Sequence, residues 1–394
     1  MAGHWIGLGI VSLMALAALR PPRRPSWLRQ PGYLVGWMIN EMPLVWALLV
    51  VLASWLTLHE RHWRIQDPQL AVALAAGAML IGLLILLQLR ARGARDAFDD
   101  ALRESLRIGL PHRDRRALRW LNLSSVVLPF RRRGSGVTHL RNVRYGEHGY
   151  RNLLDVYTPR DRTPVGLFVH FHGGHFRIGR KDTQSLPLLY ELAREGWVCV
   201  SANYRLQPRA QFPDFVVDAK RAIAWARNHA LEQGIDPDMI VAAGDSAGGY
   251  LALFAGATPN DPRYQPGFED EDTRVRAVVG LYGYYGRTSE DPTSSPLDHL
   301  TAELPPTLLV HGELDSSVPV EWAREAVAEL RSVATEPVVY AEIPGAQHTF
   351  DYFRSPRCEA LIEATSRFLW WLRGGPEPND EELRGRPDSA PADS

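Results

Sequence analysis

The chain has 394 residues, with 44 Lys plus Arg against 45 Asp plus Glu and a formal net charge of −1. This balance argues against a dedicated nucleic-acid-binding protein. The 45% apolar and 23% charged residues are typical of a folded protein, and the length predicts two or three domains. Cys199 and Cys358 are too few for a disulfide scaffold. Only Lys181 and Lys220 among the 44 basic residues are lysines, a bias that favours a bacterial source with a GC-rich genome.

Residues 1–95 are predicted to form a membrane anchor. The clearest span is 70–89, twenty residues without a charge, which as a helix would be about 30 Å long. A second span is predicted at 35–58, although it includes Asn40 and Glu41. The first apolar run, 4–19, is interpreted as an uncleaved span; the alternative is a signal peptide cleaved after an Ala-Leu-Ala sequence. The sequence therefore predicts two or three transmembrane helices.

The arginines around these runs predict the orientation of the anchor. The loop after the first run carries four arginines, and many more follow the third run, whereas the loop between the second and third runs has only Arg61 and Arg64. By the positive-inside rule, the first loop and everything beyond residue 90 lie in the cytoplasm. The predicted location is a bacterial inner membrane, with the rest of the chain beyond residue 90 on its cytoplasmic side.

Two segments are predicted to belong neither to the anchor nor to the folded domain that follows it. Residues 90–144 contain fourteen arginines against five acidic residues, and 96–137 are interpreted as a basic juxtamembrane linker. That linker could contact lipid headgroups or form part of a cap, or it could be a solvated connection. Residues 374–394 are rich in Pro, Asp and Glu and are predicted to be a disordered acidic tail.

Between residues 138 and 373 the pattern changes to short β-rich runs that alternate with helical stretches, notably 213–231 and 321–332. This alternation predicts a mostly parallel α/β sheet flanked by helices. The expected strands are 152–157, 165–171, 198–203, 239–243, 275–282, 307–310 and 338–343.

A serine motif follows one of these strands. The strand 239–243 leads into Gly244-Asp245-Ser246-Ala247-Gly248, and a helical stretch comes next. This matches the nucleophile elbow, a strand-to-helix turn that needs small residues on both sides of the serine. Ser246 is therefore the candidate nucleophile.

About seventy residues upstream, His172-Gly173-Gly174-His175 follows the strand 165–171. Glycines at this place leave backbone N–H groups unobstructed, as an oxyanion hole requires. The histidines at 170, 172 and 175 also allow a metal-site interpretation. That interpretation is disfavoured because no nearby carboxylate or cysteine completes a ligand set, so no metal is predicted.

An acid and a histidine follow the last two strands, in the order expected of a catalytic triad. Asp315 comes after the strand 307–310 and is preferred over Glu313, which is closer to the strand end. His348 comes after the strand 338–343. An imidazole can take the serine proton, and a carboxylate can orient that imidazole.

From about residue 140 to 373 the chain resembles the α/β-hydrolase superfamily, and within it the carboxylesterases grouped with the hormone-sensitive lipases. The matching segments, in chain order, are His172-Gly173-Gly174, Ser201 to Leu206, Phe212-Pro213 leading to Asp218-Ala219, Gly244 to Gly249, and His311-Gly312 before Asp315. The resemblance implies an α/β-hydrolase fold and a serine-dependent esterase with the triad Ser246, Asp315 and His348. It also implies an oxyanion hole built from the N–H groups of Gly173, Gly174 and Ala247. His175 stands where the family usually has a third glycine and is a possible substrate-pocket residue.

The predicted function is thus a membrane-anchored serine carboxylesterase or lipase that needs no metal or organic cofactor. Its partners would be a hydrophobic ester or acyl-lipid substrate and the lipid bilayer. An amidase or peptidase on the same fold is the alternative, and a non-catalytic binding protein is a weaker one because no triad member is missing.

Overall fold

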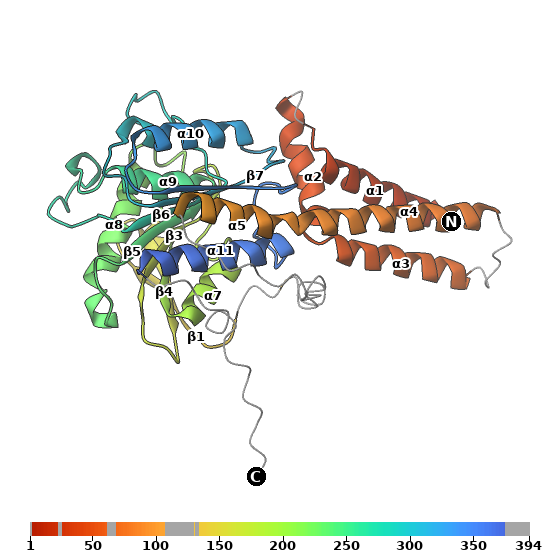
Figure 1. Cartoon of the computed structure of the whole chain (residues 1–394), viewed down its shortest axis with the longest axis horizontal. Helices are drawn as coiled ribbons and strands as arrows, with labels where there is room; N and C mark the ends of the chain where they lie inside the picture. Colours follow the sequence, from red (N-terminus) through yellow and green to blue (C-terminus); the bar gives the residue numbers. More distant parts are fainter. Residues whose placement is uncertain (1, 23–25, 61–67, 107–129, 131–133, 375–394) are drawn as a thin grey trace, which may run out of the picture.

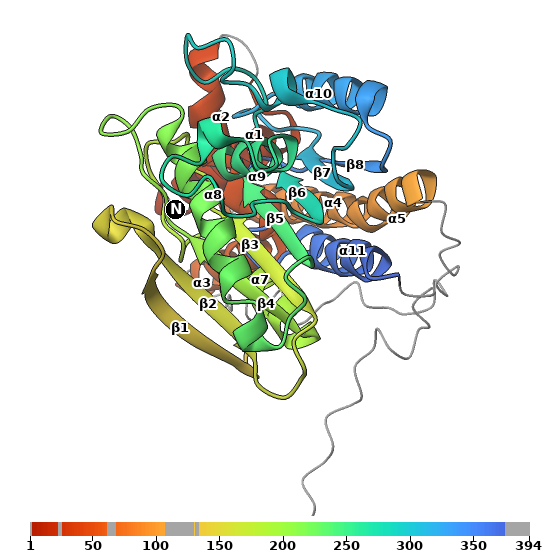
Figure 2. The same cartoon turned by 90° about the vertical axis from the view of Figure 1, so that its left-hand side faces the viewer.

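The computed structural model describes residues 2–22, 26–60, 68–106, 130 and 134–374. Its centre is an eight-stranded sheet with the order β1-β2-β4-β3-β5-β6-β7-β8 (Figures 1 and 2). The strands are β1 Val137–Arg144, β2 Leu153–Pro159, β3 Gly166–Phe171, β4 Trp197–Ala202, β5 Ile240–Asp245, β6 Ala277–Leu281, β7 Thr307–Gly312 and β8 Val338–Ile343. β1 and β2 pair antiparallel to each other and β2 pairs antiparallel to β4, whereas all pairs from β4 to β8 are parallel.

The parallel strands are buried on both faces, which explains why they read as nearly continuous apolar runs. In β3, Val169 and Phe171 contribute to one hydrophobic core, and Phe168 contributes to the other. The first core includes α8 Asp214–Asn228, α9 Ala247–Ala257 and α10 Val320–Val333. The second includes α5 Gly93–Leu106, α7 Leu186–Glu195 and α11 Pro356–Leu372. Helices therefore cover both faces of the sheet (Figure 1).

Short 3-10 turns connect several of these elements: η1 Ser26–Leu28, η2 Gly149–Asn152, η3 Leu231–Gln233, η4 Pro262–Tyr264 and η5 Pro296–His299. The seven expected strands are all present, with ends that differ by a few residues. The expected helical stretches correspond to α8 and α10. The sequence pattern missed β1, because its residues alternate irregularly between buried and exposed positions and so lack a two-residue period.

Three N-terminal helices are long and apolar enough to cross a membrane: α1 Ala2–Leu19, α3 Pro43–Glu60, and a continuous run over 68–106 that comprises α4 Pro68–Ala91 and α5. α1, α3 and α4 project from the catalytic domain as an elongated bundle (Figure 1). Their exposed apolar side chains include Ile6, Leu13, Leu48 and Met79, which is 79% exposed. Such surface is unfavourable in water and suits contact with lipid.

The expected span 35–58 has different boundaries in the structure. Its first residues belong to a separate helix, α2 Arg29–Glu41, and the apolar helix α3 begins only at Pro43. Proline is favoured at the first position of a helix and cannot continue the preceding one, which accounts for the break. α2 lies across the end of the bundle that is nearest the catalytic domain (Figure 1). Gly36 brings it against the backbone of α1, where an added Cβ would lie 3.1 Å from Ala17 C.

Part of the expected linker at 96–137 lies among the described residues. Residues 93–106 form α5, which packs against α11 and β8 and buries Phe98 and Leu102 in the second core. Arg95 of α5 pairs with Glu363 of α11 at 2.5 Å. The anchor helix α4 therefore runs into a structural layer of the catalytic domain. Residues 107–129 and 131–133, which complete the expected linker, and most of the expected disordered tail, 375–394, lie outside the described residues.

Candidate active site

Ser246, Asp315 and His348 each follow the carboxyl end of a parallel strand: β5, β7 and β8 respectively. Because β6 is the only strand between β5 and β7, and β8 adjoins β7, these three ends lie next to one another. Open α/β sheets collect their functional groups at this edge. The same edge faces α2 and the bundle of N-terminal apolar helices, since α2 hydrogen-bonds residues in the loops after β7 and β8.

The turn at Ser246 has the strained geometry of a nucleophile elbow. Ser246 has φ 54° and ψ −113°, a conformation that non-glycine residues rarely adopt, and α9 begins at the next residue. The turn requires close backbone approach: a Cβ on Gly248 would lie 1.9 Å from Phe171 O. The Ser246 N–H donates to Leu281 O at 2.8 Å. The hydroxyl is thus presented at the N-terminus of a buried helix.

His348 and Asp315 form a direct pair. His348 Nδ1 lies 2.6 Å from Asp315 Oδ2, and both side chains are at least 95% buried. The other carboxylate oxygen accepts two backbone N–H groups, from Ser317 and Val318, each at 2.8 Å. Burial alone would raise the pKa of Asp315, but the neighbouring His348 and a hydrogen bond from His311 outweigh it and lower that pKa well below its ordinary value. The carboxylate stays ionised and fixes the imidazole, as a triad acid must.

Tyr282 is close to the backbone at Ser246 and to the side chain of His348. The Ser246 N–H donates to the carbonyl of Leu281, the residue before Tyr282, and the ring of Tyr282 lies edge-on to the imidazole of His348 with centroids 4.8 Å apart. Glu313, the alternative acid, is engaged elsewhere. Its Oε2 accepts from Arg90 at 3.0 Å and from the Gly345 N–H at 2.7 Å.

The three backbone N–H groups expected to form the oxyanion hole belong to Gly173, Gly174 and Ala247, and they differ in their hydrogen bonds. Gly173 abuts Ser246, since an added Cβ would lie 3.0 Å from Ser246 Cβ. Its N–H donates to Gln184 Oε1 at 2.5 Å. In this arrangement the Gly173 amide is occupied, which differs from the expected three-donor hole. Gly174 has φ +128°, and Ala247 is the first residue of α9, so its N–H is one that a helix leaves without an internal partner.

The three neighbouring histidines have separate surroundings. His170 Nε2 lies 2.9 Å from Asp245 Oδ2, and His172 Nδ1 donates to Gly173 O at 2.7 Å. His175 is exposed and has φ 53°. Partial desolvation, followed by the charge of His348, lowers the His175 pKa. Among the described residues no three His, Cys, Asp or Glu side chains are grouped to hold a metal ion.

A buried polar network that sequence reasoning missed lies beneath the elbow. Ser185 Oγ is 2.8 Å from Asp245 Oδ1 and 2.9 Å from Asp351 Oδ2, so one hydroxyl connects two carboxyl groups. The Tyr282 hydroxyl donates to Asp351 at 2.6 Å. Burial and the nearby charge of Asp245 raise the pKa of Asp351 to about 6. This network supports Tyr282, and Tyr282 in turn packs on His348.

Sequence reasoning also missed the contribution of α2. Tyr33 Oη lies 2.5 Å from Thr349 Oγ1, and Trp37 Nε1 donates to Thr349 O at 3.0 Å. The Tyr33 ring is edge-on to His348, with centroids 6.0 Å apart. The only available signal was the polar pair Asn40-Glu41 inside an otherwise apolar run, which marks a place where the chain is not facing lipid.

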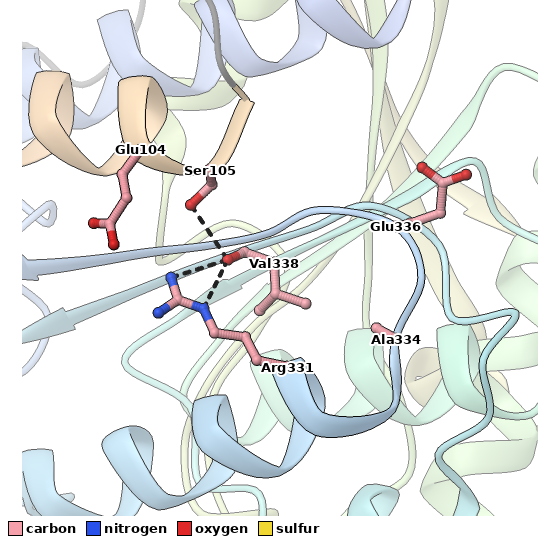
Figure 3. Close-up of a pocket in the computed structure, with 6 residues that line it drawn as sticks. All are labelled: Glu104, Ser105, Arg331, Ala334, Glu336 and Val338. Carbon is pink, nitrogen blue, oxygen red and sulfur yellow. Dashed lines mark hydrogen bonds between the residues drawn. The ribbon is translucent and has the colours of Figure 1, made fainter.

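A shallow pocket of about 320 Å³ lies at the opposite end of the sheet. It is lined by Glu104 and Ser105 of α5, by Arg331 and Ala334 near the end of α10, and by Glu336 and Val338 (Figure 3). The Val338 carbonyl accepts hydrogen bonds from Arg331 and Ser105 there. Because Val338 begins β8, this pocket is at the amino end of the parallel strands, away from Ser246.

The sheet order, the elbow serine and the Asp–His pair on adjacent strand ends define an α/β-hydrolase. A family model described as BD-FAE matches residues 154–289. The probable carboxylic ester hydrolase LipM of Mycobacterium tuberculosis is 35% identical, and the match covers 93% of this chain and 92% of LipM. The chain therefore belongs to the α/β-hydrolase family of carboxylic ester hydrolases, with three apolar helices before its catalytic domain.

Further relatives agree with this assignment. Esterase LipQ of the same bacterium is 35% identical over 64% of this chain and 66% of its own length. The solved structure of Thermogutta terrifontis esterase 2 phosphoramylated by tabun is 27% identical, with a TM-score of 0.53, and covers 62% of this chain and 97% of that chain. A truncated carbohydrate esterase from gut microbiota, 20% identical with a TM-score of 0.55, shares the fold.

Proposed function

We propose that this protein is a membrane-anchored serine carboxylesterase whose triad is Ser246, His348 and Asp315. The observation that carries the proposal is the 2.6 Å contact between His348 Nδ1 and Asp315 Oδ2, beside a serine in the nucleophile-elbow conformation. A serine hydroxyl is a weak nucleophile until a positioned imidazole removes its proton. Here the buried carboxylate holds Nδ1 and leaves Nε2 to act as the base.

In the proposed mechanism Ser246 Oγ attacks the ester carbonyl and passes its proton to His348. The imidazolium then protonates the leaving alcohol, giving an acyl-enzyme, and water hydrolyses this intermediate with His348 again as the base. The N–H groups of Gly174 and Ala247 stabilise the tetrahedral oxyanion, and Gly173 joins them if Gln184 releases its amide. Each such donor typically contributes about 3 kcal/mol. The mechanism uses no metal or organic cofactor.

The relatives support both the chemistry and the nucleophile. LipM and LipQ are named as a probable carboxylic ester hydrolase and an esterase. Solved structures of Thermogutta terrifontis esterase 2 are described as phosphorylated by paraoxon and as butyrate-bound. A covalent organophosphate adduct requires an activated nucleophile, which is the role we assign to Ser246.

Membrane anchorage and substrate class form the second part of the proposal. α1, α3 and α4 span the bilayer, and the arginine distribution places the catalytic domain in the cytoplasm, at a bacterial inner membrane. Because the edge that carries Ser246 faces the anchor, hydrophobic esters or acyl lipids near the membrane surface are the proposed substrates. His175, at the rim of the site, would contact them.

The test is covalent labelling of the full-length protein in detergent with a fluorophosphonate probe. Wild type should be labelled on Ser246, and Ser246→Ala should lose both labelling and hydrolysis of p-nitrophenyl esters. Labelling of another serine would contradict the assignment. A parallel series of aryl amides separates an esterase from an amidase or peptidase, and absence of any turnover or labelling would support a non-catalytic binding role instead.

A further inference from the structure

The loop after β8 that carries His348 is held by the membrane anchor at both of its ends. At its start, Asn40 Nδ2 of α2 donates to Gly345 O at 2.9 Å. At the other side of His348, Tyr33 and Trp37 of the same helix both bond Thr349. Three residues on successive turns of one helix thus contact the two ends of a short loop, and α2 lies over it between the bundle and the catalytic domain (Figure 1).

Buried charges reinforce the first of these attachments. Arg357 Nη1 lies 3.1 Å from Glu41 Oε1, and both side chains are fully buried. The same guanidinium donates to Pro344 O from its Nε at 3.3 Å. The Gly345 N–H donates to Glu313, which is paired with Arg90 at the end of α4. The start of the loop is therefore fixed by residues of α2 and α4.

The second attachment acts on a strained residue. Thr349 directly follows His348 and has φ 54°, in the left-handed region. A β-branched residue in this region is unusual and persists only where its surroundings hold it there. Both bonding groups that Thr349 offers to α2 are used: its hydroxyl by Tyr33 and its carbonyl by Trp37. Thr349 is itself nearly buried.

We propose that Tyr33 and Trp37 are positioning residues for catalysis, which hold Thr349 in its left-handed conformation and thereby hold His348 in line with Ser246. This inference rests on the proposed role of His348 as general base. It assigns to the membrane anchor a part in the reaction as well as in location. Neither side chain needs to touch the substrate, since Tyr33 acts through the Thr349 hydroxyl and Trp37 through the Thr349 carbonyl.

A purely structural role for α2 predicts something different. If Tyr33 and Trp37 only packed the anchor against the catalytic domain, conservative changes would lower thermal stability and leave the chemistry of the folded protein unchanged. If they position His348, the turnover number falls in a protein that is still folded. The affinity for a small ester stays the same, because the binding pocket is not altered.

The experiment uses the full-length protein in detergent with p-nitrophenyl acetate. Trp37→Phe and Tyr33→Phe each remove one hydrogen bond and keep an aromatic ring. We expect kcat, and the rate at which a fluorophosphonate labels Ser246, to fall about tenfold or more, with KM changed less than twofold. Leu34→Ala is the matched control on the same helix, since Leu34 is 65% exposed, and it should behave as wild type.

A glycine at position 349 provides the decisive comparison. Glycine adopts positive φ without the steric penalty of threonine, so Thr349→Gly no longer needs α2 to hold its conformation. Trp37→Phe should therefore lower kcat by a much smaller factor in the Thr349→Gly background than in the wild-type background. The proposal is overturned if kcat and the labelling rate are unchanged in both Trp37→Phe and Tyr33→Phe. It is also overturned if Trp37→Phe lowers kcat by the same factor with threonine and with glycine at position 349. Failure of the proposed function is a separate result, because Ser246→Ala would then remain active.

Discussion

Glu41 and Arg357 form an ion pair with no exposed side-chain surface, although 316 residues separate them along the chain. Glu41 ends α2, and Arg357 begins α11, which packs against the sheet. Burial raises the pKa of Glu41, and the charge of Arg357 opposes that rise. The pair therefore joins α2, at the end of the N-terminal helical bundle, to the catalytic domain at a place where neither charge has access to water.

Removing one partner of this pair should destabilise the folded protein strongly. Glu41→Gln leaves the Arg357 charge buried without a counter-ion, which typically costs about 3–5 kcal/mol. The expected result is a clear fall in the midpoint of thermal unfolding in detergent. The double variant Glu41→Leu with Arg357→Met, which buries apolar groups of similar size, should recover most of that loss.

The exposed pair Arg95–Glu363 offers a matched control. Because its arginine side chain is 51% exposed, solvent screens the interaction, and Arg95→Ala should change stability by less than about 1 kcal/mol. Equal effects of Glu41→Gln and Arg95→Ala would contradict the role given to the buried pair.

The two acids after β7 should differ sharply in their effect on catalysis. Asp315→Asn keeps the shape of the side chain but cannot stabilise the His348 imidazolium, and kcat should fall by a factor on the order of 10⁴. Glu313→Gln removes a support of the Gly345 amide, and its effect on kcat should stay below about tenfold. Steady-state kinetics with one p-nitrophenyl ester measures both. If Glu313→Gln lowered kcat more than Asp315→Asn, Glu313 rather than Asp315 would be the triad acid.

Acid should destabilise the protein through His172. Desolvation lowers the pKa of this buried histidine to about 4, and its Nε2 has no hydrogen-bond partner among the described residues. The unfolded chain takes up a proton near pH 6.5 while the folded protein does not, so stability is lost as the pH falls from 6.5 to 4. The loss from this group is about 3 kcal/mol. The stability difference between wild type and His172→Gln should shrink over that range in chemical unfolding.

The contribution of Asp351 to stability should change with pH in the opposite direction to that of His172. Its pKa in the folded protein is raised to about 6, so the folded state holds a proton that the unfolded chain releases near pH 4. The stability that comes from holding this proton is present at low pH and is lost as the pH rises from about 4 to 6. The advantage of wild type over Asp351→Asn should therefore be larger at pH 4 than at pH 7. These pKa shifts would be contradicted if the stability difference from wild type changed with pH in the same direction for His172→Gln and for Asp351→Asn.

The orientation of the anchor can be measured with single cysteines. The native Cys199 and Cys358 are buried and should react poorly. Glu60→Cys, at the exposed end of α3, should react in intact cells with a membrane-impermeant maleimide. Ser332→Cys, on the exposed end of α10, should react only with a permeant reagent. The reverse pattern would place the catalytic domain outside the cytoplasm.

The strands, the elbow and the order of the triad could be predicted from the sequence because each depends on local pattern. Ser246 follows a short apolar strand and lies between glycines that the turn requires, and Asp315 and His348 lie in loops just past strand ends. The contribution of α2 could not be predicted in this way. Its polar residues at 40 and 41 interrupt an apolar run, and their partners, Gly345 and Arg357, are more than three hundred residues away.

α5 is a second element whose role could not be predicted from the composition of the sequence. The many arginines around it suggested a basic linker, whereas Phe98 and Leu102 form an apolar stripe that packs on the second core. Composition averages over both faces of a helix, and only the spacing of the apolar residues reveals the buried face. The Gln184 contact with the Gly173 amide was equally invisible, since it depends on the path of a loop between β3 and α7.

The continuous run from α4 into α5 leaves no flexible tether between the bilayer and the catalytic domain. If α4 spans the membrane as proposed, the domain can neither swing away from the surface nor rotate freely above it. The entrance to Ser246 then stays at a nearly constant height over the headgroups. Such an enzyme samples esters by diffusion within a plane, and its turnover should follow the surface density of substrate in the membrane rather than the bulk concentration.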